Sequence, residues 1–185
     1  MLKIENLSFS YNDEQIIKNF SALFKKGERV CVKGESGKGK TTLLRLICGL
    51  EKPCGGTVVF TENENIGAVF QSDVLLPWYT AFENVKLVSD ERRAAEWLTA
   101  FELENSFEKY PSELSGGMCR RVAIARAVAF EPDILVLDEA FKGLDKVLKE
   151  KVMNIISEKF SEKICIFTSH DENEISEFST RVIEL

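Results

Sequence analysis

Short apolar runs alternate along this chain with stretches whose apolar residues recur at helical spacing. The first run, 2–11, alternates apolar and polar positions, which predicts a strand with one buried face. The run 134–137 is apolar throughout, and the strand predicted at 164–169 is apolar over its first four residues, as is typical of strands buried on both faces of a parallel sheet. Further short strands are predicted at 28–33, 57–60 and 66–70.

Helices are predicted between these strands. The stretch after residue 40 reads as a helix that stops at Gly49, and 91–103 carries apolar residues three and four apart. We interpret the aromatic residues of this second stretch, Trp97 and Phe101, as core packing. Two more helices are predicted at 118–130 and 146–160.

The alternation of strands and helices predicts the fold class. Parallel strands joined by right-handed crossovers form an α/β sheet flanked by helices. Between residues 72 and 113 the pattern is mainly helical, which predicts a helical insert in that sheet fold. We expect one domain, because 185 residues suffice for a single sizeable core.

Charge and hydropathy exclude several classes of function. The net charge is −6, with 44% hydrophobic and 29% charged residues, so the chain is globular and ill suited to coating nucleic acid. No run of 18 apolar residues occurs, and the amino-terminal residues do not resemble a signal peptide. Any membrane role would therefore come through a partner.

The cysteines point to neither a metal site nor disulfides. There are 5 of them, scattered and without a CxxC pair, and the single histidine, His170, is far from four of them. We expect reduced thiols.

A phosphate-binding loop stands at residues 34–41. The segment matches G-x-x-x-x-G-K-[ST], follows a predicted strand and opens a predicted helix. Its glycines let successive N–H groups converge on phosphates; Lys40 adds a charge at the β- and γ-phosphates, and Thr41 a hydroxyl for Mg²⁺. The nucleotide-binding residues expected here are Gly34, Glu35, Ser36, Gly37, Lys38, Gly39, Lys40, Thr41 and Thr42.

Two acids end the apolar run 134–137. Parallel sheets bind ligands at the carboxyl ends of their strands, so Asp138 is expected to hold Mg²⁺ through water, and Glu139 to orient and deprotonate the attacking water. Alone, the pair would be better interpreted as an exposed start of a loop. Because a phosphate-binding loop precedes the pair in the same chain, the catalytic interpretation is favoured.

Residues 114–117, Leu-Ser-Gly-Gly, open the predicted 118–130 helix. Ser115 with Gly116 and Gly117 exposes backbone N–H groups at a positive helix end, which suits an anion. Considered alone, the segment is simply a good N-cap.

These three motifs in this order resemble the ATP-binding cassette (ABC) ATPases over nearly the whole chain. The resemblance implies a P-loop NTPase core, a small amino-terminal antiparallel β part and a helical subdomain at 72–128 within one domain, 1–185. It also implies roles for four more residues. Tyr11 would stack on adenine, Gln71 would touch Mg²⁺ and water, Asp145 would lie at a dimer interface, and His170 would contact the γ-phosphate.

The sequence departs from the family pattern at several places. Met118 stands where the family usually has Gln, and Ser169 where it has Thr. Lys142-Gly143 replaces the commoner Ser-Ala. The chain also ends soon after His170, where members usually continue, and we expect no regulatory domain after the cassette.

The resemblance implies partners as well. Two cassettes would face head to tail with MgATP between them, Lys40 coming from one chain and Ser115 from the other, and we expect a homodimer. The segment 68–78 with 138–141 is most similar to the nitrate, sulfonate and taurine importer group. An ATPase on the cytoplasmic face of the membrane is therefore expected, with a multi-span permease, a solute-binding protein and no nucleic acid. Trp78 is either a core anchor or part of the groove for the permease.

Three other functions stay open. One is a non-transport ABC ATPase acting on nucleic acid or ribosomes, which the acidic charge disfavours. A small-molecule kinase would leave residues 114–117 and His170 unused. A regulatory subunit that binds ATP without turnover is suggested only by Met118 and the short carboxyl-terminal part.

Overall fold

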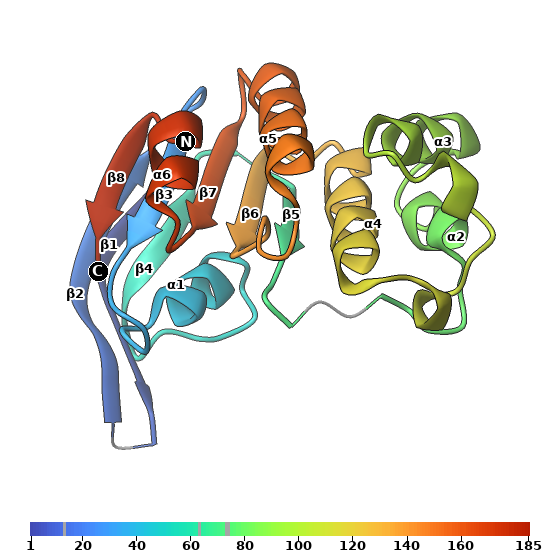
Figure 1. Cartoon of the computed structure of the whole chain (residues 1–185). Coiled ribbons are helices and arrows are strands. Elements are labelled where there is room, and N and C mark those ends of the chain that lie inside the picture. The colour runs from blue at the N-terminus through green and yellow to red at the C-terminus, as the bar shows by residue number, and fades with distance from the viewer. Residues whose placement is uncertain (13, 63, 73–74) are drawn as a thin grey trace.

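A computed structural model describes residues 1–12, 14–62, 64–72 and 75–185, and confirms the α/β class. A five-stranded parallel sheet in the order β5-β6-β7-β3-β8 forms the centre of the fold (Figure 1). Its strands are β3 (Arg29–Lys33), β5 (Ile66–Val69), β6 (Ile134–Asp138), β7 (Ile164–Thr168) and β8 (Arg181–Glu184). Of these, β8 was not predicted.

A smaller antiparallel sheet, in the order β2-β1-β4, packs beside the parallel one. Its strands are β1 (Leu2–Tyr11), β2 (Glu14–Phe24) and β4 (Gly55–Phe60). Sequence patterning did not identify β2, because Asn19 takes a positive φ of 48° and the register with β1 shifts repeatedly, so apolar and polar residues do not alternate cleanly.

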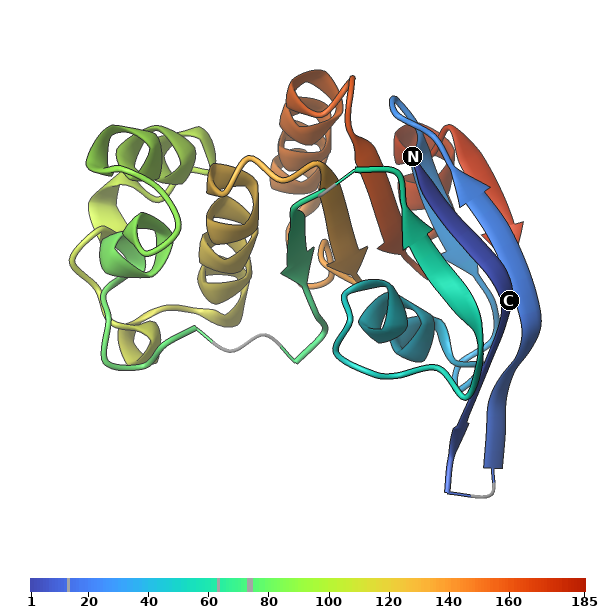
Figure 2. The ribbon, with the colours of Figure 1, turned by 180° about the vertical axis from the view of Figure 1, so that it is seen from behind.

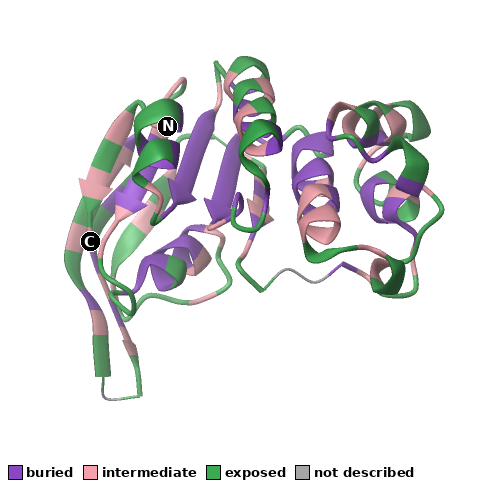
Figure 3. Cartoon of the chain, in the orientation of Figure 1, coloured by how far each residue is buried: buried purple, intermediate pink, exposed green. Residues whose placement is uncertain are grey.

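The core lies on both faces of the parallel sheet. Helix α1 (Lys40–Ile47) packs between the two sheets, where Val30 and Val136 contribute to one apolar cluster. The neighbouring residues Cys31 and Leu137 belong to a second cluster under the outer helices. β6 and β7 are buried along their whole length, as their apolar runs predicted (Figure 3).

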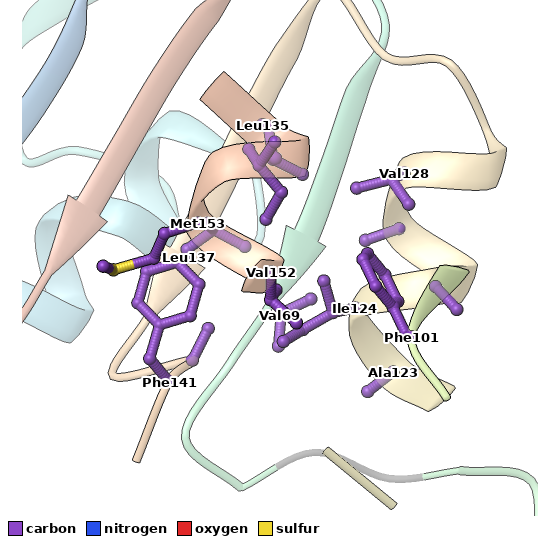
Figure 4. Close-up of a cluster of buried hydrophobic side chains, with 14 of the residues drawn as sticks. Val69, Phe101, Ala123, Ile124, Val128, Leu135, Leu137, Phe141, Val152 and Met153 are labelled. Atoms are coloured by element: carbon purple, nitrogen blue, oxygen red, sulfur yellow. The ribbon is translucent and has the colours of Figure 1, made fainter. Parts of the chain in front are cut away.

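Three helices, α2 (Ala81–Lys86), α3 (Glu91–Ala100) and α4 (Gly116–Ala129), pack together beyond β5 (Figures 1 and 2). Ile124 of α4 lies beside Val69 of β5, and both share one apolar cluster with Phe101, which joins this group to the sheet (Figure 4). α3 ends three residues before the predicted 103 because Glu102 takes a φ of 58°, which stops the helix. The subdomain bounds 72–128 stay a prediction.

The last two helices cover the sheet near the candidate site. They are α5 (Lys146–Lys159), which was predicted, and α6 (Glu172–Phe178), which was not. None of the helices in the described ranges combines the length and apolar content that crossing a bilayer requires. Three residues of predicted features, Asp13 of the first turn and Asp73 and Val74 of the 68–78 segment, lie outside the described residues.

Candidate active site

The predicted phosphate-binding loop joins β3 to α1. Gly37 and Gly39 take φ values of 82° and 91°, in the region that favours glycine. A Cβ on Gly39 would lie 2.6 Å from Cγ2 of Ile16, so this position has no room for a side chain. No described side chain caps α1, and its first N–H groups with the positive helix end suit an anion.

Lys40 lies across this loop. Its side chain is buried, and its Nζ donates hydrogen bonds to the carbonyl oxygens of Gly34 (2.8 Å) and Glu35 (2.9 Å). The ammonium group is thus held over the concave side of the loop by two neutral acceptors, where it can exchange them for phosphate oxygens.

Asp138 ends β6 and joins three elements. Its Oδ2 accepts a hydrogen bond from the Thr41 hydroxyl (2.7 Å) and its Oδ1 one from the Thr168 hydroxyl (2.6 Å). The carboxylate is only 2% exposed, so these two bonds compensate for the water it loses. The arrangement brings together two of the three oxygen donors expected at Mg²⁺, Thr41 and Asp138, from positions 97 residues apart.

Glu139 follows with a φ of 47°, an uncommon value for a side chain of this kind. Its backbone N–H donates to Thr168 Oγ1 (3.0 Å). Gln71 Nε2 and Lys142 Nζ lie 3.4 and 3.1 Å from its Oε2, and His170 Nε2 lies 3.4 Å from its Oε1. The side chain is 15% exposed, so the expected base faces a small polar space bounded by three nitrogen groups.

A cavity of about 230 Å³ unites most of the predicted residues. Its floor is the phosphate-binding loop and its wall is the edge of the sheet. The described residues that line it are Ile16, Ser36, Gly37, Gly39, Lys40, Thr41, Thr42, Gln71, Asp138, Glu139 and His170. Gly34, Glu35 and Lys38 line a second cavity of about 520 Å³, which His170 also borders.

The remaining predicted residues lie outside that lining. Ser115 caps α4 by accepting from Met118 N (3.3 Å), and both Ser115 and Gly116 are exposed. Gly117 lies against the 142–145 segment, because a Cβ there would stand 3.1 Å from the carbonyl oxygen of Gly143. Asp145 is exposed and caps α5 through Leu148 N (3.1 Å).

Tyr11 lies at the far end of β1. It is 43% exposed, packs edge-on against Phe9 with ring centroids 4.7 Å apart, and donates a hydrogen bond to Glu51 (3.2 Å). An exposed, supported ring suits stacking, which stays a prediction. Trp78, by contrast, is 67% exposed, so its interpretation as a core anchor is wrong.

Sequence reasoning missed two polar residues of the site. Thr168 joins Asp138 to the backbone of Glu139, and its only signal is a hydroxyl at the end of an otherwise apolar run. Lys142 was noted only as a departure from the family pattern, although a cation three residues after Glu139 can reach it when the chain turns there. All five cysteines are free in this structure.

Comparison with known proteins decides the family. Residues 17–142 match the family described as "ABC transporter". Over 206 residues the chain is 36% identical to a spermidine/putrescine import ATP-binding protein of Mannheimia succiniciproducens, covering 100% of this chain and 55% of that protein. The chain belongs to the ABC transporter family. The chain spans about half the length of the first curated relatives that it matches.

Other members of the ABC family match over more of their length. An aliphatic sulfonates import ATP-binding protein of Rhodococcus jostii is 36% identical over 192 residues, covering 100% of this chain and 78% of the relative. An ergothioneine transport ATP-binding protein of Helicobacter pylori is 33% identical over 206 residues, covering 100% and 97%. The sulfonate protein and a bicarbonate one agree with the importer group suggested by the sequence.

Solved ABC structures confirm the fold. An ATP-binding cassette solved as a dimer in a post-hydrolysis state, with ADP and Pi, superposes with a TM-score of 0.90 at 34% identity. The match covers 100% of this chain and 94% of that one. This chain thus has the architecture of a cassette solved as a dimer.

Proposed function

We propose that this chain binds ATP with Mg²⁺ and hydrolyses it as the motor subunit of an ABC importer. The observation that carries the proposal is the single cavity that joins the phosphate-binding loop, Asp138, and Glu139 with Gln71 and His170. A phosphate-binding surface, a metal-type carboxylate and a candidate base converge there from five separate segments of the chain.

The donor set fits Mg²⁺. Thr41, Asp138 and Gln71 present hydroxyl, carboxylate and amide oxygens, the hard ligands that this ion takes, and the Thr41–Asp138 hydrogen bond already joins two of them. When bound, the ion would neutralise charge that develops on the phosphate oxygens.

The residues of the cavity divide the remaining work. Lys40 and the first turn of α1 hold the phosphates by charge and hydrogen bonds. Glu139 orients a water molecule and takes its proton as that water attacks the γ-phosphorus in line with the leaving ADP oxygen. Gln71 and His170, which flank Glu139, contact the water and the γ-phosphate respectively.

The site is completed by a second cassette. Ser115 and Gly116 are exposed and do not line this chain's own cavity among the described residues, which suits a role on the ATP of a neighbouring chain. Tyr11 stacks on adenine, and Asp145 lies at the interface between the two chains. The dimeric relative with ADP and Pi supports this arrangement.

A multi-span permease is the second partner, together with a solute-binding protein, at the cytoplasmic face of the membrane. Trp78 supports this contact, because a Trp that is 67% exposed suits a partner surface better than solvent. The import names of the relatives support the direction of transport. We expect the solute to contact the permease and the solute-binding protein.

Two experiments test the proposal. Glu139→Gln is expected to retain ATP and form a lasting dimer while phosphate release falls to background, because the amide cannot take the proton of water. Wild-type phosphate release in that variant would refute Glu139 as the base. Purification of the tagged chain from gently solubilised membranes is expected to bring a multi-span protein with it, and a clean soluble chain would refute the transporter assignment.

A further inference from the structure

A partly buried cluster of ionised side chains lies next to His170. Lys149, in the first turns of α5, places its Nζ 2.5 Å from Glu174 Oε1 and 3.1 Å from Asp171 Oδ2. The other oxygen of Glu174 accepts a hydrogen bond from the Ser169 hydroxyl (2.5 Å). The Ser169 hydroxyl oxygen in turn accepts from the backbone N–H of Asp171 (3.0 Å).

This cluster holds the residues on both sides of His170. Ser169 and Asp171 are both tied through it to α5, whereas the imidazole between them is about half exposed and points toward Glu139. The same residues form one side of a cavity of about 350 Å³ that Glu139 and Lys142 line on the other. A displacement of the start of α5 would therefore reach the histidine through Lys149.

The burial of the cluster makes this connection stiff. The side chain of Glu174 is 6% exposed and that of Lys149 is 19% exposed, whereas Asp171 at the edge of the cluster is 39% exposed, so the burial concerns the Lys149–Glu174 pair. A carboxylate so far from water needs its cation, and separating the two would leave an uncompensated buried charge. The hydrogen bond from Lys149 also holds the pKa of Asp171 below its usual range.

We propose that Lys149 is a positioning residue. Through its ion pairs with Glu174 and Asp171, it fixes the position of His170 relative to Glu139 and to the start of α5, which Asp145 caps. The inference rests on the proposed function, because it assigns the histidine to the γ-phosphate. Movement at the 142–145 segment, where a second cassette is expected, would then alter the position of the histidine. Lys149 itself touches neither nucleotide nor water in this scheme.

The test removes both buried charges at once. In Lys149→Met with Glu174→Gln the shapes are kept and the glutamine can still accept from Ser169. The carboxylate that loses its cation, Asp171, is 39% exposed, so water can solvate it. The single variant Lys149→Arg keeps a cation at this position and serves as the conservative variant. The matched control is Lys163→Met, which breaks a partly buried ion pair with Asp133 (2.6 Å) at the opposite end of β6 and β7.

Two readouts separate positioning from stability. The kcat for ATP is expected to fall on the order of 10-fold or more in the double variant while KM changes by less than about 2-fold, because misplacement of a contact to the transition state leaves ground-state binding intact. The chain has a single histidine, so its imidazole NMR signals report on His170 alone and need no turnover. These signals should shift in the double variant and stay close to their wild-type positions in Lys149→Arg.

The outcomes are distinct. A folded double variant with wild-type imidazole signals and wild-type kcat would overturn the inference, as would equal losses in the Lys163→Met control. If the double variant does not fold, Asp171→Asn removes one contact of Lys149, and unchanged imidazole signals there would overturn it equally. Absence of hydrolysis in the wild type would refute the proposed function, while the NMR comparison would still decide the positioning role.

Discussion

Thr168→Val is the most direct test of how the site is held together. The exchange keeps the shape of the side chain but removes the hydroxyl that donates to Asp138 (2.6 Å) and accepts from the backbone N–H of Glu139 (3.0 Å). Both Thr168 and Asp138 are nearly fully buried, so water cannot easily replace either bond.

The magnitude follows from these two losses. A hydrogen bond to a charged group contributes about 1.5–3 kcal/mol, and a buried N–H left without a partner costs about 1–3 kcal/mol. We therefore expect the free energy of unfolding to fall by roughly 3–5 kcal/mol. Because Asp138 also loses one of its two restraints, the Mg²⁺ concentration needed for half-maximal ATP hydrolysis should rise.

Thr180→Val supplies the matched control. Thr180 also makes two hydrogen bonds through its hydroxyl, accepting from Arg29 N (2.8 Å) and donating to Arg29 O (3.2 Å), but the residue is exposed. Water can replace both, so a loss of no more than about 1 kcal/mol is expected. Urea unfolding followed by circular dichroism measures both variants. Equal destabilisation by the two exchanges would refute the argument that burial makes the Thr168 bonds matter.

Two further predictions concern titratable groups away from the nucleotide. Burial raises the pKa of Cys165 to about 12 and that of Cys31 to about 11. Iodoacetamide at mildly alkaline pH should therefore label the exposed Cys54 and leave Cys165 and Cys31 unmodified, as peptide mass spectrometry can show. Early labelling of Cys165 would contradict its burial. The hydrogen bond from Lys163 lowers the folded-state pKa of Asp133. The Asp133 carboxylate therefore contributes to the free energy of unfolding above its unfolded-state pKa of about 3.9, and this contribution is lost as the pH falls through the lower folded-state pKa. Asp133→Asn should therefore flatten the acid dependence of the unfolding free energy in that range, and an unchanged slope would contradict the assignment.

The sequence alone was sufficient where a function lies within one short segment. The phosphate-binding loop is contiguous, and both its glycines and Lys40 act through local backbone geometry. The strands at 134–137 and 164–169 were recognisable because a strand buried on both faces has consecutive apolar residues, here 134–137 and 164–167. These features need only neighbours along the chain, so their pattern survives without tertiary information.

Patterning failed where local structure depends on distant partners. β2 and β8 are held by pairing with β1 and β3, and their own sequences carry irregular or very short patterns. The observed end of α3 differs from the predicted end for a local reason. Glu102 takes a left-handed conformation, which no pattern of apolar residues encodes.

Only the tertiary structure decided which side chains meet. The Thr41–Asp138 bond joins residues 97 positions apart, and Thr168 reaches the same carboxylate from a neighbouring strand. In the sequence, Lys149 and Glu174 are an ordinary lysine and glutamate, typical of solvated helix faces. They become a buried pair behind His170 because α5 and α6 pack together over the sheet. Local pattern therefore determined most of the elements and the nucleotide loop. The folding of the sheet determined β2, β8 and the network around the loop, because parallel strands bring distant carboxyl ends to one edge.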